Sequence, residues 1–250
     1  MSGWLKIVGL GPGNDDLITP AVQETLDEAT DVVGYIPYVR RIAPREGLTL
    51  HESDNRVEVE RATHALEMAA SGKMVAVVSS GDPGVFAMAS AVFEAFESGP
   101  SEWRNLDIQV LPGITAMLAA SAAAGSPLGH DFCAINLSDN LKPWDLIEKR
   151  IRLAAQADFA MAFYNPRSKA RPEGFERALN VLREECEPER IVIFARAVST
   201  TDQSIRHVML SDATGDMADM RTVVIVGSSQ TRVIARDTSP IIYTPRSVSC

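Results

Sequence analysis

The sequence of 250 residues is poor in the side chains that most often bind metals or form disulfide bridges. It contains only four histidines and three widely separated cysteines, Cys133, Cys186 and Cys250. No CxxC pair or other zinc-ligand spacing is present. We therefore expect no metal site and no disulfide framework, and a reduced compartment is the simplest setting for these thiols.

The sequence also lacks long apolar runs and an excess of positive charge. Residues 4–8 lead straight into glycines, without the charged and apolar regions of a secretory signal. The most apolar later run, residues 114–124, is far shorter than the roughly 20 residues that span a bilayer. A net charge of −9 argues against a chain whose main partner is nucleic acid. We expect a cytoplasmic protein with no membrane and no nucleic-acid partner.

Apolar segments suited to strands alternate with helical patterns through the first half of the chain. Strands are expected at residues 4–10, 31–35, 48–53, 74–80 and 106–111, and helices at 20–29, 57–71 and 85–96. Thr19 is placed to cap the first of these helices, and Pro20 suits its first position. Strands that alternate with helices of this length predict a mostly parallel sheet covered on both faces.

A second α/β domain is expected from residue 125 onward. Gly125, Ser126 and Pro127 have the composition of a linker, so the predicted domains are residues 1–124 and 125–250. Strands are expected at residues 132–137, 158–164, 190–198, 204–210 and 222–227, and helices at 144–157 and 173–186. The segment around Asp202 is only turn-sized, so we predict an antiparallel hairpin there and a mixed sheet.

Three glycine-bearing turns follow strands of the first half. They are Val8-Gly9-Leu10-Gly11-Pro12-Gly13, Ser79-Ser80-Gly81-Asp82-Pro83-Gly84-Val85-Phe86 and Leu111-Pro112-Gly113-Ile114-Thr115-Ala116. Ligands of open α/β sheets bind beyond the carboxyl ends of the strands, where such turns lie. A dinucleotide fingerprint is incomplete, because Asn14 stands where its third glycine belongs and Gly34-Tyr35 replaces the acidic residue. Each turn alone is as consistent with a structural turn as with a ligand loop.

Asp82 in the second turn has two interpretations. Its carboxylate could bind an amine or a ribose hydroxyl of a ligand, or it could cap the helix expected from Val85. Thr115 likewise offers a hydroxyl group at a helix start, beside backbone donors without helical partners. Phe86 is expected to lie in the core.

Taken together, the three turns resemble the tetrapyrrole methylase superfamily in their order and spacing. The resemblance continues in residues 34–38, 127–135, 137–139, 142–144, 163–169 and 226–232, which look like the branch that methylates C17 of precorrin-3B. It implies two α/β domains that bind S-adenosylmethionine in the cleft between them. It also implies ring contraction to precorrin-4 in cobalamin biosynthesis, and a homodimer.

The resemblance implies a set of cofactor contacts, many of them through backbone groups. They are Leu10, Pro12, Ser80, Gly81, Asp82, Val85, Thr115, Ala116, Asn165 and Ala197. Around the last of these, residues 195–203 depart from the family pattern, in which a Gly-Arg-like turn is common. Tyr164 is expected to pack nearby.

A tetrapyrrole substrate carries several carboxylates, which guanidinium groups bind well. Cationic side chains in predicted loops or strand ends are Arg40, Arg167, Lys169, Arg171, Arg196 and Arg232. Substrate contacts are expected at Tyr35, Tyr38, Arg40, Ser138, Arg167, Lys169 and Arg232. Ring contraction requires proton transfers, for which the candidates are His130, Asp131, Asp139, Tyr35 and Tyr38. The sequence does not single out one of them.

Three alternatives to this function remain open. The substrate could be cobalt-precorrin-3B, the counterpart in the anaerobic branch of the pathway. Another branch of the superfamily modifies protein or ribosomal RNA, which the acidic balance disfavours. A nucleotide-binding regulatory module without catalysis would bind the cofactor and transfer no methyl group.

Overall fold

The computed structural model describes residues 3–54 and 57–247, and its contacts divide the chain into two compact units, Met1–Thr115 and Ala116–Cys250. This division falls nine residues before the domain boundary expected at residue 125. Gly125 and Ser126 do not form a linker: they form β6 (Gly125–Ser126), which pairs with a strand of the second unit.

The first unit is built on a sheet of five parallel strands, as predicted. The strands are β1 (Trp4–Gly9), β2 (Asp31–Tyr35), β3 (Thr49–Ser53), β4 (Met74–Ser79) and β5 (Asp107–Leu111). Their order across the sheet is β3-β2-β4-β1-β5. All four pairings are parallel, so every strand of this sheet ends at the same edge.

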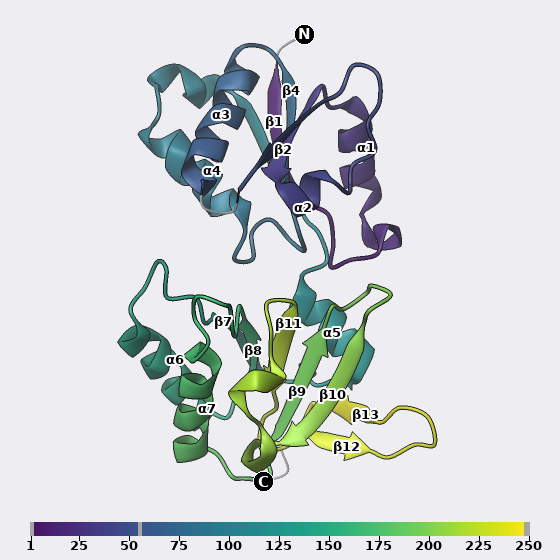
Figure 1. Ribbon diagram of the computed structural model, residues 1–250, viewed down its shortest axis with the longest axis vertical. Helices are drawn as coiled ribbons and strands as arrows, with labels where there is room; N and C mark the ends of the chain where they lie inside the picture. Colours follow the sequence, from purple (N-terminus) through teal and green to yellow (C-terminus); the bar gives the residue numbers. More distant parts are fainter. Residues whose placement is uncertain (1–2, 55–56, 248–250) are drawn as a thin grey trace. The chain divides into compact units, whose positions relative to one another are not determined.

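Helices cover both faces of this sheet (Figure 1). On one face, α1 (Pro20–Glu28) buries Val22 and Leu26 against Val8 and Val32 of the strands. The opposite face carries α3 (Glu58–Ala70) and α4 (Met88–Ser98). Thr19 caps α1 as predicted, because its hydroxyl group accepts the Val22 backbone N–H at 3.4 Å.

Three short helical segments complete the first unit. The sequence prediction did not include the short α2 (Ile36–Val39) or the 3-10 helices η1 (Asp15–Leu17) and η2 (Ser101–Asn105). The start expected for α4 at Val85 is wrong by three residues, because the chain stays irregular through Phe86, whose φ is +54°.

The second unit contains a mixed sheet, as predicted. Its strands are β7 (Phe132–Asn136), β8 (Ala160–Tyr164), β9 (Ile191–Arg196), β10 (Ser204–Met209) and β11 (Thr222–Val226), in the order β10-β9-β11-β8-β7. β7 and β8 are parallel. β11 runs antiparallel to both of its neighbours, β8 and β9, and β10 pairs with β9, also antiparallel. α6 (Trp144–Gln156) and α7 (Gly174–Glu185) pack on one face, and α5 (Ala116–Ala124) contacts β11.

A second, small sheet in this unit was not predicted. It consists of β12 (Arg232–Ile234), β13 (Ile241–Tyr243) and β6, in that order. Two or three residues per strand are too few to show an alternating pattern, and β6 pairs with β13 across more than a hundred residues of sequence.

Two cysteines of the second unit are half-buried and free. Cys133 and Cys186 pack against the core around Phe163 and Phe175, and burial raises the pKa of both thiols above the ordinary value. Both therefore serve as packing residues, while Cys250 lies outside the described residues. Within residues 3–54 and 57–247 no helix combines the length and the apolar character needed to traverse a bilayer.

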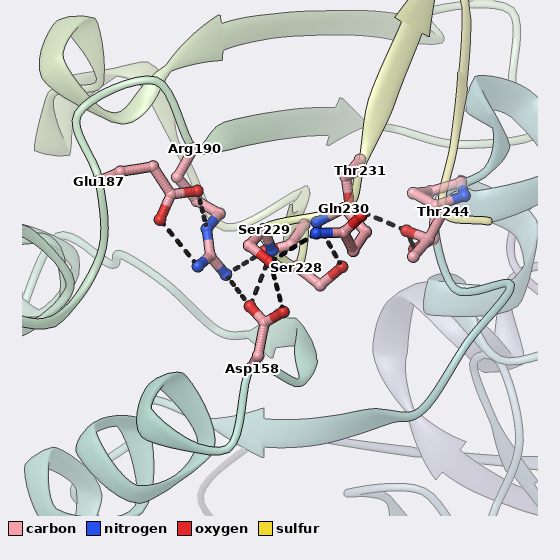
Figure 2. Close-up of polar contacts among 10 residues, drawn as sticks. Asp158, Glu187, Arg190, Ser228, Ser229, Gln230, Thr231 and Thr244 are labelled. Atoms are coloured by element: carbon pink, nitrogen blue, oxygen red, sulfur yellow. Dashed lines mark hydrogen bonds and ion pairs between the residues drawn. The ribbon is translucent and has the colours of Figure 1, made fainter. Parts of the chain in front are cut away.

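A buried arginine organises the edge of the large second sheet where β11 ends (Figure 2). Arg190 has a side chain only 4% exposed, and it binds both carboxylate oxygens of Glu187 at 2.7 and 2.9 Å. Its remaining contacts are Asp158 at 3.0 Å and the Gly227 carbonyl oxygen at 3.0 Å. Asp158 also accepts the backbone N–H and hydroxyl group of Ser229. Arg190 thus ties the turn after β11 to the loop before β8.

We predict that Arg190→Met lowers the free energy of unfolding by about 1–3 kcal/mol, since it leaves the buried Gly227 carbonyl oxygen without its donor. The matched control is Arg221→Met. Arg221 pairs with Asp202 at 3.1 Å on the surface, so this change should cost less than about 1 kcal/mol. Urea unfolding followed by circular dichroism measures both, and equal losses for the two variants would contradict the role of Arg190.

Candidate functional site

The strand order of the first unit brings the three glycine-bearing turns together. β1 lies between β4 and β5, so the turns that follow these strands are neighbours at one edge of the sheet. Gly11 and Gly81 exchange two backbone hydrogen bonds, of 3.2 and 2.9 Å. The Leu10 N–H also donates to the Ser79 carbonyl oxygen at 2.8 Å. The first two turns are therefore linked backbone to backbone.

The third turn approaches so closely that side chains have no room. A Cβ atom on Gly9 would lie 2.5 Å from the Gly81 carbonyl oxygen and 2.8 Å from the Gly113 Cα atom. A Cβ atom on Gly113 would overlap the same Gly81 oxygen and lie 2.8 Å from the Gly9 oxygen. Glycine is required at both positions because the backbones themselves are in contact.

Asp82 connects two of these turns. One carboxylate oxygen accepts the Gly84 backbone N–H at 2.8 Å, and the other accepts the Gly113 backbone N–H at 3.0 Å. The suggestion that Asp82 caps α4 is wrong: the residue before that helix is Ala87, and it makes no side-chain cap. Each carboxylate oxygen retains a second lone pair, so Asp82 can still accept a hydrogen bond from a ligand.

The first turn is held from a third side by an arginine that the sequence prediction missed. Arg41 donates to the Leu10 carbonyl oxygen and to the Asp15 carboxylate, both at 2.8 Å. It lies just after α2, and a contact with a turn thirty-one residues earlier leaves no local sequence signal.

The expected cofactor residues of the first unit all lie at this edge. Leu10, Gly81 and Thr115 are buried, while Pro12, Ser80, Asp82 and Val85 are half-buried. Phe86 does not lie in the core: its side chain is 46% exposed on the irregular segment before α4. Its left-handed φ of +54° is costly for a bulky residue, and such strain often marks a functional loop.

The same edge carries a pair of tyrosines at the end of β2. The rings of Tyr35 and Tyr38 meet edge to face with centroids 5.3 Å apart. Burial, followed by the neighbouring Tyr35, raises the pKa of the Tyr38 hydroxyl group above its usual value. A tyrosine hydroxyl group is already protonated at neutral pH, so this shift leaves Tyr38 as a neutral hydrogen-bond donor that gives up its proton less readily. Arg40 nearby is exposed and pairs with Glu52 at 3.2 Å.

In the second unit, Asn165 and Ala197 follow β8 and β9 at one edge of the large sheet. β11 lies between these two strands and begins at that edge. Both residues have left-handed backbones, with φ of +51° and +49°. Ala116 begins α5, and the Tyr164 hydroxyl group accepts the N–H of the next residue, Met117, at 3.0 Å.

The structure separates the polar candidates of the second unit into two groups. Ser138, Asp139, Arg167 and Lys169 lie in the loops after β7 and β8, at the same edge as Asn165. His130 and Asp131 precede β7 and therefore lie at the opposite edge.

The two edges are about 17 Å apart, since β7 has five residues that each rise about 3.3 Å. His130 and Asp131 line a cavity of about 110 Å³ beside Asp158 and Ser228, near the Arg190 contacts of Figure 2. Arg232 is exposed at the start of β12, in the small sheet.

Comparisons with known proteins identify the family. The sequence model of the tetrapyrrole (corrin/porphyrin) methylases matches residues 5–214. The chain therefore belongs to the tetrapyrrole (corrin/porphyrin) methylases, a family of methyltransferases.

The chain is also similar to individual members of this family that are named as C17-methyltransferases. The chain is 49% identical over 247 residues to a precorrin-3B C(17)-methyltransferase of Sinorhizobium sp., covering 98% of this chain and 97% of that one. It is 36% identical to a probable cobalt-factor III C(17)-methyltransferase of Salmonella typhimurium, covering 92% and 94%.

Solved structures agree with this assignment. The crystal structure of the methyltransferase CobJ is 68% identical, with a TM-score of 0.94 over 98% of this chain and 100% of that one. A uroporphyrin-III C-methyltransferase of Thermus thermophilus complexed with S-adenyl homocysteine shares the fold at 21% identity and a TM-score of 0.68, covering 90% and 92%.

We predict that Gly113→Ala lowers the free energy of unfolding by about 1–3 kcal/mol, because the added methyl group collides with backbone rather than a flexible side chain. Gly84→Ala is the matched control: its nearest neighbour would be Asp82 Oδ1 at 3.2 Å, and the change should stay within about 1 kcal/mol. Denaturant melts give both values. A Gly113→Ala variant as stable as the control would refute the close packing of the turns.

Proposed function

We propose that the chain transfers a methyl group from S-adenosylmethionine to C17 of precorrin-3B, with ring contraction to precorrin-4, in cobalamin biosynthesis. The observation that carries this proposal is the 49% identity to a precorrin-3B C(17)-methyltransferase along nearly the whole of both chains. The glycine-bearing turns that meet at one sheet edge support it, because this is where α/β folds bind their ligands.

The residues at this edge fit the proposed cofactor. Gly9, Gly81 and Gly113 let the three turns pack backbone against backbone, and Asp82 has lone pairs available for an amine or a ribose hydroxyl group. When bound, S-adenosylmethionine supplies an electrophilic methyl group on a positively charged sulfur. The proposed contacts are Leu10, Pro12, Ser80, Gly81, Asp82, Val85 and Thr115 in the first unit, and Ala116, Asn165 and Ala197 in the second.

The task of the chain in this transfer is mainly positioning. Alignment of the attacking ring carbon, the methyl carbon and the sulfur can supply much of the rate. The hydrogen bonds among the turns fix the backbone before any ligand binds, so little order has to be created afterwards. The left-handed conformations of Phe86, Asn165 and Ala197 place strained backbone in segments that we assign to the site.

We propose that the substrate carboxylates contact Arg167 and Lys169, with Ser138 beside them. These residues lie in two adjacent loops of the second unit. Tyr35 and Tyr38 are proposed to contact substrate at the edge of the first unit. Arg40 and Arg232 have weaker support, since Arg40 already pairs with Glu52 and Arg232 lies in the small sheet.

Among the proton-transfer candidates, Tyr38 has the best support. It follows β2 at the edge that carries the proposed cofactor turns, and Tyr35 packs against it. His130 and Asp131 have less support, because they lie at the sheet edge opposite Asn165. We also propose, on the family resemblance, that the protein acts in the cytoplasm and forms a homodimer. Sedimentation equilibrium of the purified protein tests the homodimer.

One alternative keeps the reaction and changes the substrate. The 36% identity to a probable cobalt-factor III C(17)-methyltransferase favours a cobalt-containing ring as the second candidate. A regulatory module without catalysis is the remaining alternative from another class, and it would bind the cofactor without methyl transfer.

We predict that the purified protein adds one labelled methyl group from S-adenosylmethionine to precorrin-3B, and that the cobalt-containing counterpart is not methylated. Mass spectrometry of the tetrapyrrole after each incubation gives the result, and protein without tetrapyrrole is the control. Methylation of the cobalt form alone would transfer the proposal to the second candidate. Cofactor binding in calorimetry without methylation of either ring would leave only the regulatory alternative.

A further inference from the structure

Two neighbouring loops of the second unit concentrate positive charge in an acidic chain. Residues 137–143 and 165–172 contain Lys142, Arg167, Lys169 and Arg171, and Asp139 is their one acidic residue. The two segments follow β7 and β8, which are adjacent and parallel, so both leave the same sheet edge. We call these two segments the cationic loops.

The cationic loops are joined to each other by an asparagine at the end of β7. The side-chain oxygen of Asn136 accepts the Ser138 backbone N–H at 2.9 Å and the Asn165 side-chain amide at 3.1 Å. The Leu137 N–H donates to the Tyr164 carbonyl oxygen at 2.9 Å. These contacts therefore hold the starts of the two cationic loops side by side.

Arg171 is the most firmly held cation of the set. Its side chain is 24% exposed, and its Nε donates to the Ser168 hydroxyl group at 3.4 Å. Its Nη1 donates to the Ser138 hydroxyl group and contacts Asp139 at 3.4 Å. Within the described parts of the chain, no hydrogen bond uses Nη2, so one side of the guanidinium group keeps two free N–H donors.

Asp139 is itself fixed from the core side. Its second oxygen accepts the Trp144 indole N–H at 3.1 Å. Trp144 packs against the core of the second unit, and the Arg177 guanidinium group lies 4.6 Å above its ring. The order of contacts therefore runs from the core through Trp144 and Asp139 to Arg171.

Positively charged side chains outnumber carboxylates in the two cationic loops around Arg171. The two segments contain three cations besides Arg171 and no acidic residue besides Asp139. Partial burial, and then the charge of the neighbouring Arg150, lowers the pKa of Lys142. Arg167 donates to the Pro172 carbonyl oxygen at 3.1 Å, and its charge helps to lower the pKa of the fully exposed Asp216 carboxyl group. An anionic group with a planar fork of oxygens matches this arrangement.

We propose that Arg171 binds a carboxylate side chain of the tetrapyrrole substrate and that Asp139 is a positioning residue for this guanidinium group. The assignment rests on the proposed function. It replaces the role of Asp139 as a proton-transfer candidate, because both of its oxygens already accept N–H groups and protonation of either oxygen would weaken the contact made there. Arg171 thereby joins Arg167 and Lys169 as a determinant of substrate affinity.

The test is steady-state kinetics of Arg171→Ala, Arg171→Lys and Asp139→Asn, with Arg206→Ala as the matched control. Arg206 is an exposed arginine on β10, outside the cationic loops. Arg171→Ala should raise the KM for the tetrapyrrole by about tenfold to hundredfold, with kcat changed less than about threefold. Arg171→Lys keeps the charge and loses the fork, so it should recover only part of this loss.

Asp139→Asn separates positioning from proton transfer. A positioning role predicts a rise in KM of about threefold to tenfold with an unchanged pH profile of kcat, whereas a proton-transfer role predicts a fall in kcat of about a hundredfold or more and loss of one limb of the profile. That second outcome overturns the assignment of Asp139, and an unchanged KM in Arg171→Ala overturns that of Arg171.

Two further measurements keep these outcomes interpretable. Circular dichroism and the affinity for S-adenosylmethionine by calorimetry should match the wild type in every variant, and if Arg171→Ala does not fold, Arg171→Lys and Asp139→Asn decide. Absence of methyl transfer by the wild type would contradict the proposed function, whereas an active wild type with insensitive variants would contradict only this inference.

Discussion

The contact between the backbones of Gly9, Gly81 and Gly113 is the constraint on which the candidate site depends. Three turns can meet this closely only where adjacent parallel strands end at one edge and none of the three residues has a Cβ atom. Asp82 completes the arrangement by accepting one N–H from its own turn and one from the third turn. The result is a sheet edge of closely packed, hydrogen-bonded backbone, whose fixed geometry suits the positioning of a small cofactor.

The second unit builds its part of the candidate site from other residue types than the glycines of the first unit. Its strained residues after β8 and β9 are Asn165 and Ala197 rather than glycines. The loop after β8 carries Arg167 and Arg171, whose guanidinium groups are held by hydrogen bonds. A cofactor is best matched by backbone, whereas a substrate with many carboxylates is best matched by guanidinium and ammonium groups. In the proposed methyl transfer, the packed backbone at the edge of the first sheet thus serves the cofactor, and the cationic loops at the edge of the second sheet serve the substrate.

The sequence predicted the long elements because their patterns are local. β-Branched runs marked the strands of both large sheets, and the short segment around Asp202 correctly indicated the antiparallel pairing of β9 and β10. What it missed depends on distant partners: β6 pairs with β13, and Arg41 binds the Leu10 carbonyl oxygen. The helix expected from Val85 begins only at Met88, and Asp82, which the local pattern offered as its cap, accepts the Gly113 N–H from a distant turn instead. The meeting of the turns was foreseeable from their positions after strands, but the exclusion of any Cβ atom was not.

The central claim is that these three turns form the binding place of the methyl donor. The most direct test is a crystal structure of the protein soaked with S-adenosylhomocysteine. The account predicts density for the ligand against residues 9–13, 80–86 and 113–115, within hydrogen-bond distance of backbone groups there. Well-ordered density at another place in the molecule, with these turns bare, would contradict it.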